Sequence, residues 1–437
     1  MSSTHPRGIP FIIVNEIAER FSYYGMKSIL VVFMTTMLLD SAGTSAPMSK
    51  EDATFWYHIF GMGNYFVPIF GAVIADTVWG KYRTIILLSL VYCAGHAALA
   101  FNDTRAGLLL GLSLIAVGSG GIKPCVSAHL GDQYRNHSSG RLSEGFSLFY
   151  LGINVGAFVA TLLMPWLLGR YGPRVAFGVP GIFMALATLV FWLGRGRYCA
   201  LPPTPWRRYR SEVLTPGNLQ RLRGLALLFL FLSAFWALFD QTGSSWVFQA
   251  ERMDRTIRLP LGVSFTVIPS QVQAFNPILI LFLTPLCTWG LYPLLARRMR
   301  VTTELKLIVG LLLAAASFAL VSYAQARIVA GETVSIGWQL FAYLLLTAAE
   351  VMVSITSLEL AYTHAPNVSA SLSTSFYLLS IALGNGVTAV VTRLLSSIGW
   401  GPEAVMYFVS FALLAFGSAI LISMSFRSLI EEQGSAS

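Results

Sequence analysis

The chain has 437 residues, of which 55% are hydrophobic and 11% are charged, and it carries a formal net charge of +9. A soluble protein carries roughly 25% charged residues, so this composition excludes a soluble protein and indicates one that crosses a membrane many times. The positive charge would suit a nucleic-acid partner, but the positions of the basic residues along the chain argue against one, as shown below.

Twelve apolar stretches predict twelve membrane-spanning helices, since about 20 apolar residues in a helix cross a bilayer. They cover residues 10–39, 54–77, 83–101, 106–128, 144–168, 175–195, 224–248, 272–296, 304–327, 335–363, 369–396 and 402–426. No cleavable signal peptide is expected, because a short polar N-terminus leads directly into a charged helix. The four cysteines indicate no disulfide framework.

The first predicted helix carries an unusual set of charges at membrane depth. Its charged residues and two tyrosines recur every three or four positions, which places them on one stripe of a helix. They are Glu16, Glu19, Arg20, Tyr23, Tyr24 and Lys27. Lipid cannot solvate such a stripe, so it must face protein or water. A buried ion pair that only locks helices together is the alternative, but it would not need four charges and two tyrosines.

Lys and Arg residues concentrate on one side of the predicted membrane. The N-terminus, the even-numbered loops and the C-terminus carry 17 of them, the odd-numbered loops carry nine, and three lie within helices. By the positive-inside rule, both termini are therefore cytoplasmic. The excess basic charge reflects this topology and some attraction to anionic lipid rather than nucleic-acid binding.

Residues 196–223 form the longest predicted cytoplasmic connection and are rich in arginine and proline. They divide the chain into an N-terminal six-helix bundle, 1–195, and a C-terminal six-helix bundle, 224–437. The predicted fold is an all-α membrane protein with its binding site between two bundles, near the middle of the membrane. Residues 71–83 resemble the loop signature of the major facilitator superfamily, although a plain basic loop would show similar Gly and Lys content.

Further polar side chains lie at membrane depth in the N-terminal half. His58, in the second helix, either titrates, because its unperturbed pKa is nearest neutrality, or is held by a backbone carbonyl. The segment 118–124 combines glycines, which let another helix approach closely, with Lys123. This cation needs an anionic partner, for which Glu16 or Glu19 is expected.

The C-terminal half supplies carboxylates at similar depths. Asp240 lies within the seventh helix, roughly level with Lys27, and a pair between them would cross the bundle interface. Asn276 precedes a proline that starts the eighth helix, and it either caps a kink or faces a cavity. Glu350 lies deep in the tenth helix, where a carboxylate without a function would cost a few kcal/mol on insertion.

No metal-ligand cluster, Ser/His/Asp arrangement, phosphate-binding loop or ATP-binding domain is visible in the sequence. The chain is therefore not expected to be an enzyme, to bind a metal or to need a cofactor. Any uphill transport by it must draw on an ion gradient.

At the level of motifs, the first helix resembles the ExxERFxYYG motif of the proton-dependent oligopeptide transporter family, also called the peptide transporter family. The motif is complete between Glu16 and Gly25. Further stretches agree in order along nearly the whole chain: 120–124, 149–154, 235–241 and 350–385, the last including Ala365-Pro366 and Gly384-Asn385.

The resemblance implies symport of di- and tripeptides with protons, in a central cavity that opens alternately to the two sides. It implies that Glu350, Asn154 and Asn276 receive the peptide amino terminus, and that Arg20, Lys27 and Lys123 receive the carboxyl terminus. The implied cavity walls are Tyr23, Tyr24, Tyr65, Tyr150, Trp236, Ser354 and Tyr377. The residues expected to couple transport to protons are Glu16, Glu19, Arg20, His58, Lys123, Asp240 and Glu350. The depths of Lys27 and Asp240, in different bundles, separately predict that this pair is an outer gate.

Some positions depart from the family pattern. Tyr377 stands where relatives usually have Trp, and Ser369-Ala370 replaces a Met-Lys pair. The large extracellular domain of animal members and the two additional helices of many bacterial members are not expected. These features favour a multi-pass protein of a bacterial cytoplasmic membrane, in contact with lipid and functional as a monomer.

The charges themselves fit a peptide. A dipeptide zwitterion separates its charges by about 5–6 Å, given a backbone repeat of roughly 3.3–3.6 Å, and Glu350 opposite three cations matches that dipole. A carrier of nitrate or another small organic anion in the same fold is the alternative, but it has less use for Glu350. An intramembrane enzyme or a sensor is a further alternative, although no nucleophile or metal site accompanies Glu16 and Glu19.

Overall fold

The computed structural model describes residues 5–426 and residue 429, apart from residues 136, 200, 214, 259–263 and 365–369. Ala365-Pro366 and Ser369, used in the family comparison above, lie outside the described residues. The long helices are α1 (Ile9–Thr36), α2 (Lys50–Phe66), α4 (Lys81–Phe101), α5 (Arg105–Gln133), α6 (Ser139–Tyr171), α7 (Pro173–Leu193), α9 (Pro216–Phe239), α13 (Thr303–Val329), α14 (Gly337–His364), α15 (Ala370–Ser397) and α16 (Val405–Phe426).

Shorter elements complete the chain. They are α3 (Pro68–Ile74), η1 (Ala75–Trp79), η2 (Gly194–Arg197), α8 (Trp206–Val213), η3 (Asp240–Gly243), α10 (Ser245–Glu251), β1 (Thr256–Arg258), β2 (Ser264–Thr266), η5 (Pro269–Ala274), α11 (Phe275–Pro285), η6 (Leu286–Leu291) and α12 (Tyr292–Ala296). The strands pair antiparallel, with Ile257 opposite Phe265. The sequence predicted no strand, so the all-helical prediction missed this short hairpin between two membrane helices.

Within the described residues, eleven helical stretches are long and apolar enough to cross a membrane. The charges of α1 keep it out of that group, but its 28 residues give it sufficient length. Each of the twelve predicted helices thus has a counterpart. Several of the helices begin where a Ser or Thr side chain accepts a hydrogen bond from a backbone N–H of the first turn, as Ser49 does for α2 and Thr104 does for α5.

The seventh predicted helix is not continuous. It ends as α9 at Phe239, passes through the 3₁₀ turn η3 and resumes as α10. The carbonyl oxygen of Ala237 accepts from Gln241 Nε2 (2.7 Å) and from Thr388 Oγ1 of α15 (2.9 Å), so side chains satisfy the backbone beside the break. The turn brings Asp240 and Ser244 to positions from which both can reach helices of the other half of the chain.

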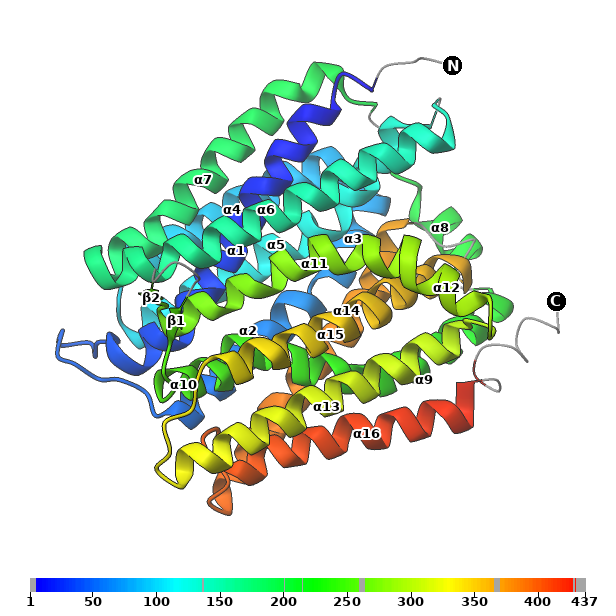
Figure 1. Ribbon diagram of the computed structural model, residues 1–437. Coiled ribbons are helices and arrows are strands. Elements are labelled where there is room, and N and C mark those ends of the chain that lie inside the picture. Colours follow the sequence, from blue (N-terminus) through cyan, green and yellow to red (C-terminus); the bar gives the residue numbers. More distant parts are fainter. Residues whose placement is uncertain are drawn as a thin grey trace.

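Two sets of helices lie side by side in Figure 1. In the first half, α1 packs against α6 and α7, and α4 packs against α5 and α7. In the second half, α9 packs against α15 and α16, and α13 packs against α14 and α16. The sets meet where α2 packs on α15 and α6 packs on α11. The predicted boundaries of the two bundles and the linker stay a prediction.

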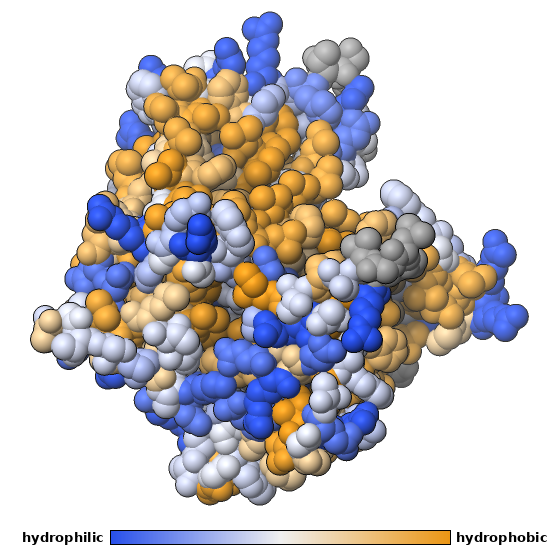
Figure 2. Space-filling view, turned by 60° about the vertical axis from the view of Figure 1, so that its left-hand side comes forward, coloured by the Kyte–Doolittle hydropathy of each residue, from blue (hydrophilic) through white to orange (hydrophobic). Residues whose placement is uncertain are grey.

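Both ends of the described chain lie on one side of the molecule. The start of α1 and the end of α16 lie toward the same end as α8, and the β1–β2 hairpin lies at the opposite end (Figure 1). We call these the α8 end and the hairpin end. Figure 2, in which the hairpin end is turned toward the viewer, shows hydrophilic residues gathered beside broad hydrophobic surfaces.

Glycines bring α3 against α5. A Cβ atom at Gly71 would lie 2.3 Å from the carbonyl oxygen of Gly120 and 2.7 Å from Cα of Gly121, so the two backbones touch. This is the close helix approach predicted from the glycines of 118–124. It fixes the depth of α5, and therefore of Lys123, relative to α2 and α3.

Candidate functional site

A central cavity of about 790 Å³ lies between the two sets of helices. This volume is within the usual range of small-molecule sites, about 300–1,000 Å³. Most of the residues that the sequence singled out line it: Glu16, Arg20, Tyr24, Lys27, Tyr65, Lys123, Tyr150, Asn154, Trp236, Asp240, Asn276, Glu350, Ser354 and Tyr377.

Three predicted residues lie behind this lining. Glu19 and His58 are fully buried and reach the cavity only through neighbours. Tyr23, predicted as part of the wall, is not among the residues that line this cavity. Its ring is completely buried, edge-on to Tyr24 at 5.3 Å and to Tyr65 at 6.3 Å between ring centres, so it supports the wall from behind.

The spacing of the charged residues in α1 produces a compact cluster, in which one cation is held by two carboxylates. Arg20 Nε lies 2.6 Å from Glu16 Oε1 and 3.3 Å from Glu19 Oε2. Glu16 is one helical turn before Arg20, which explains how the same helix supplies both partners. Protonation of either carboxylate would leave Arg20 with one anionic partner and make its charge available to the cavity.

Lys123 has a different environment from the one predicted. The expected pair with Glu16 or Glu19 is absent from the described structure, and Lys123 Nζ there has neither a hydrogen-bond nor an ion-pair partner. It lies instead 3.8 Å from the ring centre of Tyr23 and 4.5 Å from that of Tyr65, where cation–π attraction holds it. Because Arg20 occupies both carboxylates, the amino group of Lys123 is left at the cavity wall in a position to receive an anion.

The opposite side of the cavity is acidic. Asn276 Nδ2 donates to Glu350 Oε2 at 2.7 Å and lies 3.1 Å from Thr347 Oγ1. Of the two roles open to Asn276 from the sequence, the structure therefore supports a residue that faces the cavity and orients Glu350. Asn154 also lines the cavity, but its amide donates to the backbone oxygen of Tyr150 on its own helix, at 2.9 Å.

Between these poles, aromatic residues form the wall. The ring of Trp236 meets that of Tyr377 edge-on, with 6.0 Å between centres. The hydroxyl of Tyr377 is hydrogen-bonded to Ser354 Oγ at 2.7 Å. Tyr377 thus adds a polar contact to this aromatic wall.

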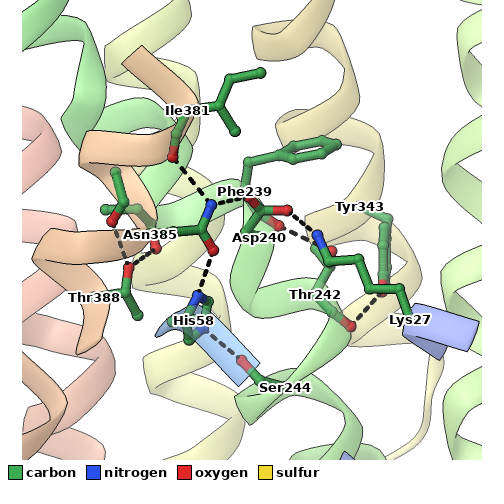
Figure 3. Close-up of polar contacts among 12 residues, drawn as sticks. Lys27, His58, Phe239, Asp240, Thr242, Ser244, Tyr343, Ile381, Asn385 and Thr388 are labelled. Carbon is green, nitrogen blue, oxygen red and sulfur yellow. Dashed lines mark hydrogen bonds and ion pairs between the residues drawn. The ribbon is translucent and has the colours of Figure 1, made fainter. Parts of the chain in front are cut away.

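The predicted pair of Lys27 and Asp240 is present, and Figure 3 shows how it continues. Lys27 Nζ donates to Asp240 Oδ1, and Asn385 Nδ2 donates to Asp240 Oδ2 at 2.5 Å. The other side of the Asn385 amide, Oδ1, lies 2.8 Å from His58 Nδ1, and His58 Nε2 lies 2.9 Å from Ser244 Oγ. The network joins α1 and α2 to η3 and α15.

Sequence reasoning missed two members of this network as site residues. Asn385 entered only as part of a matching stretch, and Ser244 was not singled out. The available signal was an amide and a hydroxyl at membrane depth, the same signal that identified Asn154 and Asn276.

Ion pairs cross between the sets of helices at the hairpin end. Lys50 Nζ lies 3.1 Å from both Glu251 Oε2 and Glu403 Oε1, and Arg393 pairs with Asp52 at 2.7 Å. The cavity lining extends the other way, to residues 131–132 at the end of α5. The cavity is therefore closed at the hairpin end and reaches toward the α8 end. No cluster of His, Cys, Asp and Glu suited to a metal occurs in the described part of the chain.

The membrane-length helices and the charged cavity between them define a membrane transporter of the major facilitator superfamily. The sequence model of the POT family matches residues 82–210 and 211–404, so the chain belongs to that family. An auto-inhibited POT family peptide transporter of known crystal structure is 35% identical, with a TM-score of 0.84 over 97% of both chains. The POT family transporter PepTSo is 33% identical, with a TM-score of 0.83 over 98% of this chain and 99% of that one.

Curated relatives from animals are longer. "Peptide transporter family 1" of Drosophila melanogaster is 39% identical over 360 residues, which is 72% of this chain and 47% of that protein. Human "Solute carrier family 15 member 2" is 36% identical over 375 residues, 75% of this chain and 50% of that protein. The chain thus spans about half the length of the curated relatives it matches.

Proposed function

We propose that this protein carries di- and tripeptides together with protons by alternating access. The observation that carries the proposal is the polarity of the cavity. In the described structure, Lys123 has no anionic partner on one side of the cavity, while Glu350, oriented by Asn276, lies on the other side. A peptide zwitterion supplies the missing partner for each, which favours it over nitrate or another small anion.

Broad selectivity follows from the same geometry. The charged groups bind the two ends that all small peptides share, and aromatic walls with few directional contacts accept different side chains. The similarity to an animal peptide transporter and to a POT family peptide transporter of known structure supports the same substrate class.

The proton gradient would supply the energy, without a cofactor. A proton on Glu16 or Glu19 removes one partner of Arg20 and frees that cation for the peptide carboxylate, which links proton and peptide binding. In this scheme the protein acts as a carrier that leaves its substrate chemically unchanged, and not as an enzyme.

We place the α8 end in the cytoplasm, because α8 and its flanking segments carry most of the arginines of the longest connection. Residues 1–195 and 224–437 then form the two moving bundles, with 196–223 as the linker. We assign the protein to a bacterial cytoplasmic membrane as a monomer surrounded by lipid. The short connection between α13 and α14, where the animal domain would stand, favours a bacterial source.

Uptake of a labelled dipeptide into proteoliposomes tests the function. An inward pH gradient should drive accumulation above equilibrium, and a proton ionophore should abolish it. Excess unlabelled dipeptide should compete, whereas nitrate should not. Competition by nitrate but not by dipeptide would assign the anion function instead, and a chemically altered product would indicate an enzyme.

A further inference from the structure

Asn385 connects two ionisable groups that do not bond to each other directly. His58 and Asp240 share no hydrogen bond in the described structure. Both contact the amide of Asn385, at 2.8 Å from Oδ1 to His58 Nδ1 and at 2.5 Å from Nδ2 to Asp240 Oδ2. All three side chains are buried, so bulk water does not screen the electrostatic interaction between them.

The orientation of this amide is determined by its acceptors. Nδ2 donates to Asp240 and also to the backbone oxygen of Ile381, at 3.0 Å. A carboxylate and a carbonyl only accept, so both contacts require the NH₂ group and leave Oδ1 facing His58. Since Oδ1 can only accept, His58 Nδ1 must carry a hydrogen in both charge states.

The proton is then gained and lost at the other ring nitrogen. His58 Nε2 faces Ser244 Oγ at 2.9 Å. A serine hydroxyl can donate to a bare nitrogen and accept from an N–H group. Rotation of that hydroxyl therefore accommodates both states of His58 without moving the ring.

Close packing holds the amide in place. A Cβ atom at Gly61, on the helix of His58, would lie 2.4 Å from Asn385 Oδ1. The backbone of α2 therefore presses on the same atom that accepts from His58. Any side chain at Gly61 would displace the amide, and this provides an independent way to disturb it.

We propose that Asn385 is a positioning residue that fixes Nε2 as the titrating nitrogen of His58 and transmits its protonation to the Lys27–Asp240 pair. This inference rests on the proposed proton coupling. The ionisable groups that face His58 are Asp240, through Asn385, the ammonium of Lys27 beyond it, and the neighbouring ring of Tyr57, 5.1 Å away between centres.

The direction of the effect follows from the charges. A proton from the water outside forms the Nε2–H bond, and Ser244 changes from donor to acceptor. The new positive charge on His58 repels the ammonium of Lys27. It also attracts the carboxylate of Asp240, so that Asp240 depends less on Lys27 for a positive partner. The pair that joins α1 to η3 weakens, and the hairpin end opens.

The test measures how accessible the cavity is from the hairpin end, and it needs no peptide. Thr161 of α6 lines the cavity next to Leu162, whose backbone oxygen accepts from Gln271. Thr161→Cys, in a variant whose four native cysteines are replaced, is labelled from outside with a membrane-impermeant thiol reagent. Labelling should rise severalfold as the pH falls from about 8 to about 5, a range that spans the unperturbed pKa of histidine.

Substitutions at Asn385 should change this pH response in opposite ways. In Asn385→Ala, labelling should vary by less than about twofold over the same range, because His58 is no longer connected to Asp240. In Asn385→Asp, the rise should move to higher pH, because a carboxylate beside Nδ1 favours the charged ring. Gly61→Ala should flatten the response as Asn385→Ala does.

Two controls separate positioning from folding. Thr388→Val removes a hydroxyl one turn along the same helix, which bonds the Ala237 carbonyl, and should keep the wild-type response. In a His58→Gln background, Asn385→Ala should add nothing further. A wild-type pH response in both Asn385 variants would overturn the proposal, whereas failure of peptide uptake with an intact labelling response would count only against the proposed substrate.

Discussion

At the scale of single residues, Glu350 is the group on which recognition of a peptide amino terminus depends. Asn276 holds its carboxylate at 2.7 Å. Glu350→Gln should weaken dipeptide binding by about 2–5 kcal/mol, the range for removing one partner of a desolvated charge pair. Binding should be measured by isothermal titration or by competition in counterflow.

A peptide without its α-amino group provides the comparison. The wild type should bind it poorly, and Glu350→Gln should lose much less with it than with the intact peptide. Glu304→Gln, at the start of α13 and outside the cavity lining, serves as the matched control. An equal loss for both ligands would show that Glu350 only maintains the structure.

A second residue-scale prediction concerns Glu19. Its carboxylate lies 3.3 Å from Arg20 Nε and is fully buried, so Glu19→Gln removes a proton acceptor and an Arg20 partner together. Uptake driven by a pH gradient should be lost, while exchange of peptide for peptide should survive. Full accumulation in this variant would refute the assignment, and Glu144→Gln on the exposed face of α6 should behave as wild type.

The charges of the site were predictable from the sequence, but their partners were predictable only in part. Lys27 and Asp240 could be paired by depth alone, since each lies on a different half of the chain. The neighbours of Lys123 could not be predicted in this way. Its ammonium can pair with Glu19 or lie over aromatic rings, and the outcome depends on whether Arg20 already binds that carboxylate. Helix spacing places side chains on a face, but it does not say which neighbours compete for them.

At the scale of elements, the length of the apolar stretches predicted where the membrane helices lie, but it did not predict where a helix is interrupted. Hydropathy does not distinguish a continuous helix from α9, η3 and α10, because the polar groups at the break are few and satisfied by side chains such as Thr388. Nor does it predict the hairpin of β1 and β2, which lies in a loop. The glycines of 118–124, by contrast, did predict a close helix contact.

That contact gives a prediction about stability. Gly71→Ala places a Cβ atom 2.3 Å from the Gly120 oxygen, and such overpacking costs about 1–3 kcal/mol. The midpoint of thermal unfolding in detergent should therefore fall. Gly169→Ala is the matched control, since a Cβ atom there would meet nothing within 4 Å. Equal midpoints for the two variants would show that α3 can move away from α5 at little cost.

At the scale of the whole molecule, closure of the hairpin end combines contacts of unequal strength. The side chains of Lys50, Glu251 and Glu403 are about one-third exposed, and exposed pairs contribute about 0–1 kcal/mol each. Lys27 and Asp240 have side-chain exposures of 8% and 7%. Breaking a buried pair by removing one partner costs about 3–5 kcal/mol. The Lys27–Asp240 pair should therefore contribute most to the free-energy difference between the conformation open at the hairpin end and the one open at the α8 end.

The last prediction tests that ranking. Asp240→Asn should increase labelling of Thr161→Cys from outside, because the closed state loses a contact that the outward-open state does not make. Lys50→Gln should increase it far less. High external salt should mimic Lys50→Gln in the wild type, since salt screens exposed charges more than buried ones.

Charge reversal then separates the pair from its individual members. Lys27→Asp combined with Asp240→Lys restores an attraction between α1 and η3, so labelling should return at least partly toward the wild-type level. Peptide binding need not recover, because Lys27 also lines the cavity. Labelling that stays at the wild-type level in Lys27→Asp alone and in Asp240→Lys alone would show that Asp240 does not gate the hairpin end. Its contacts with Asn385 would then be the ones that explain a buried carboxylate at that depth.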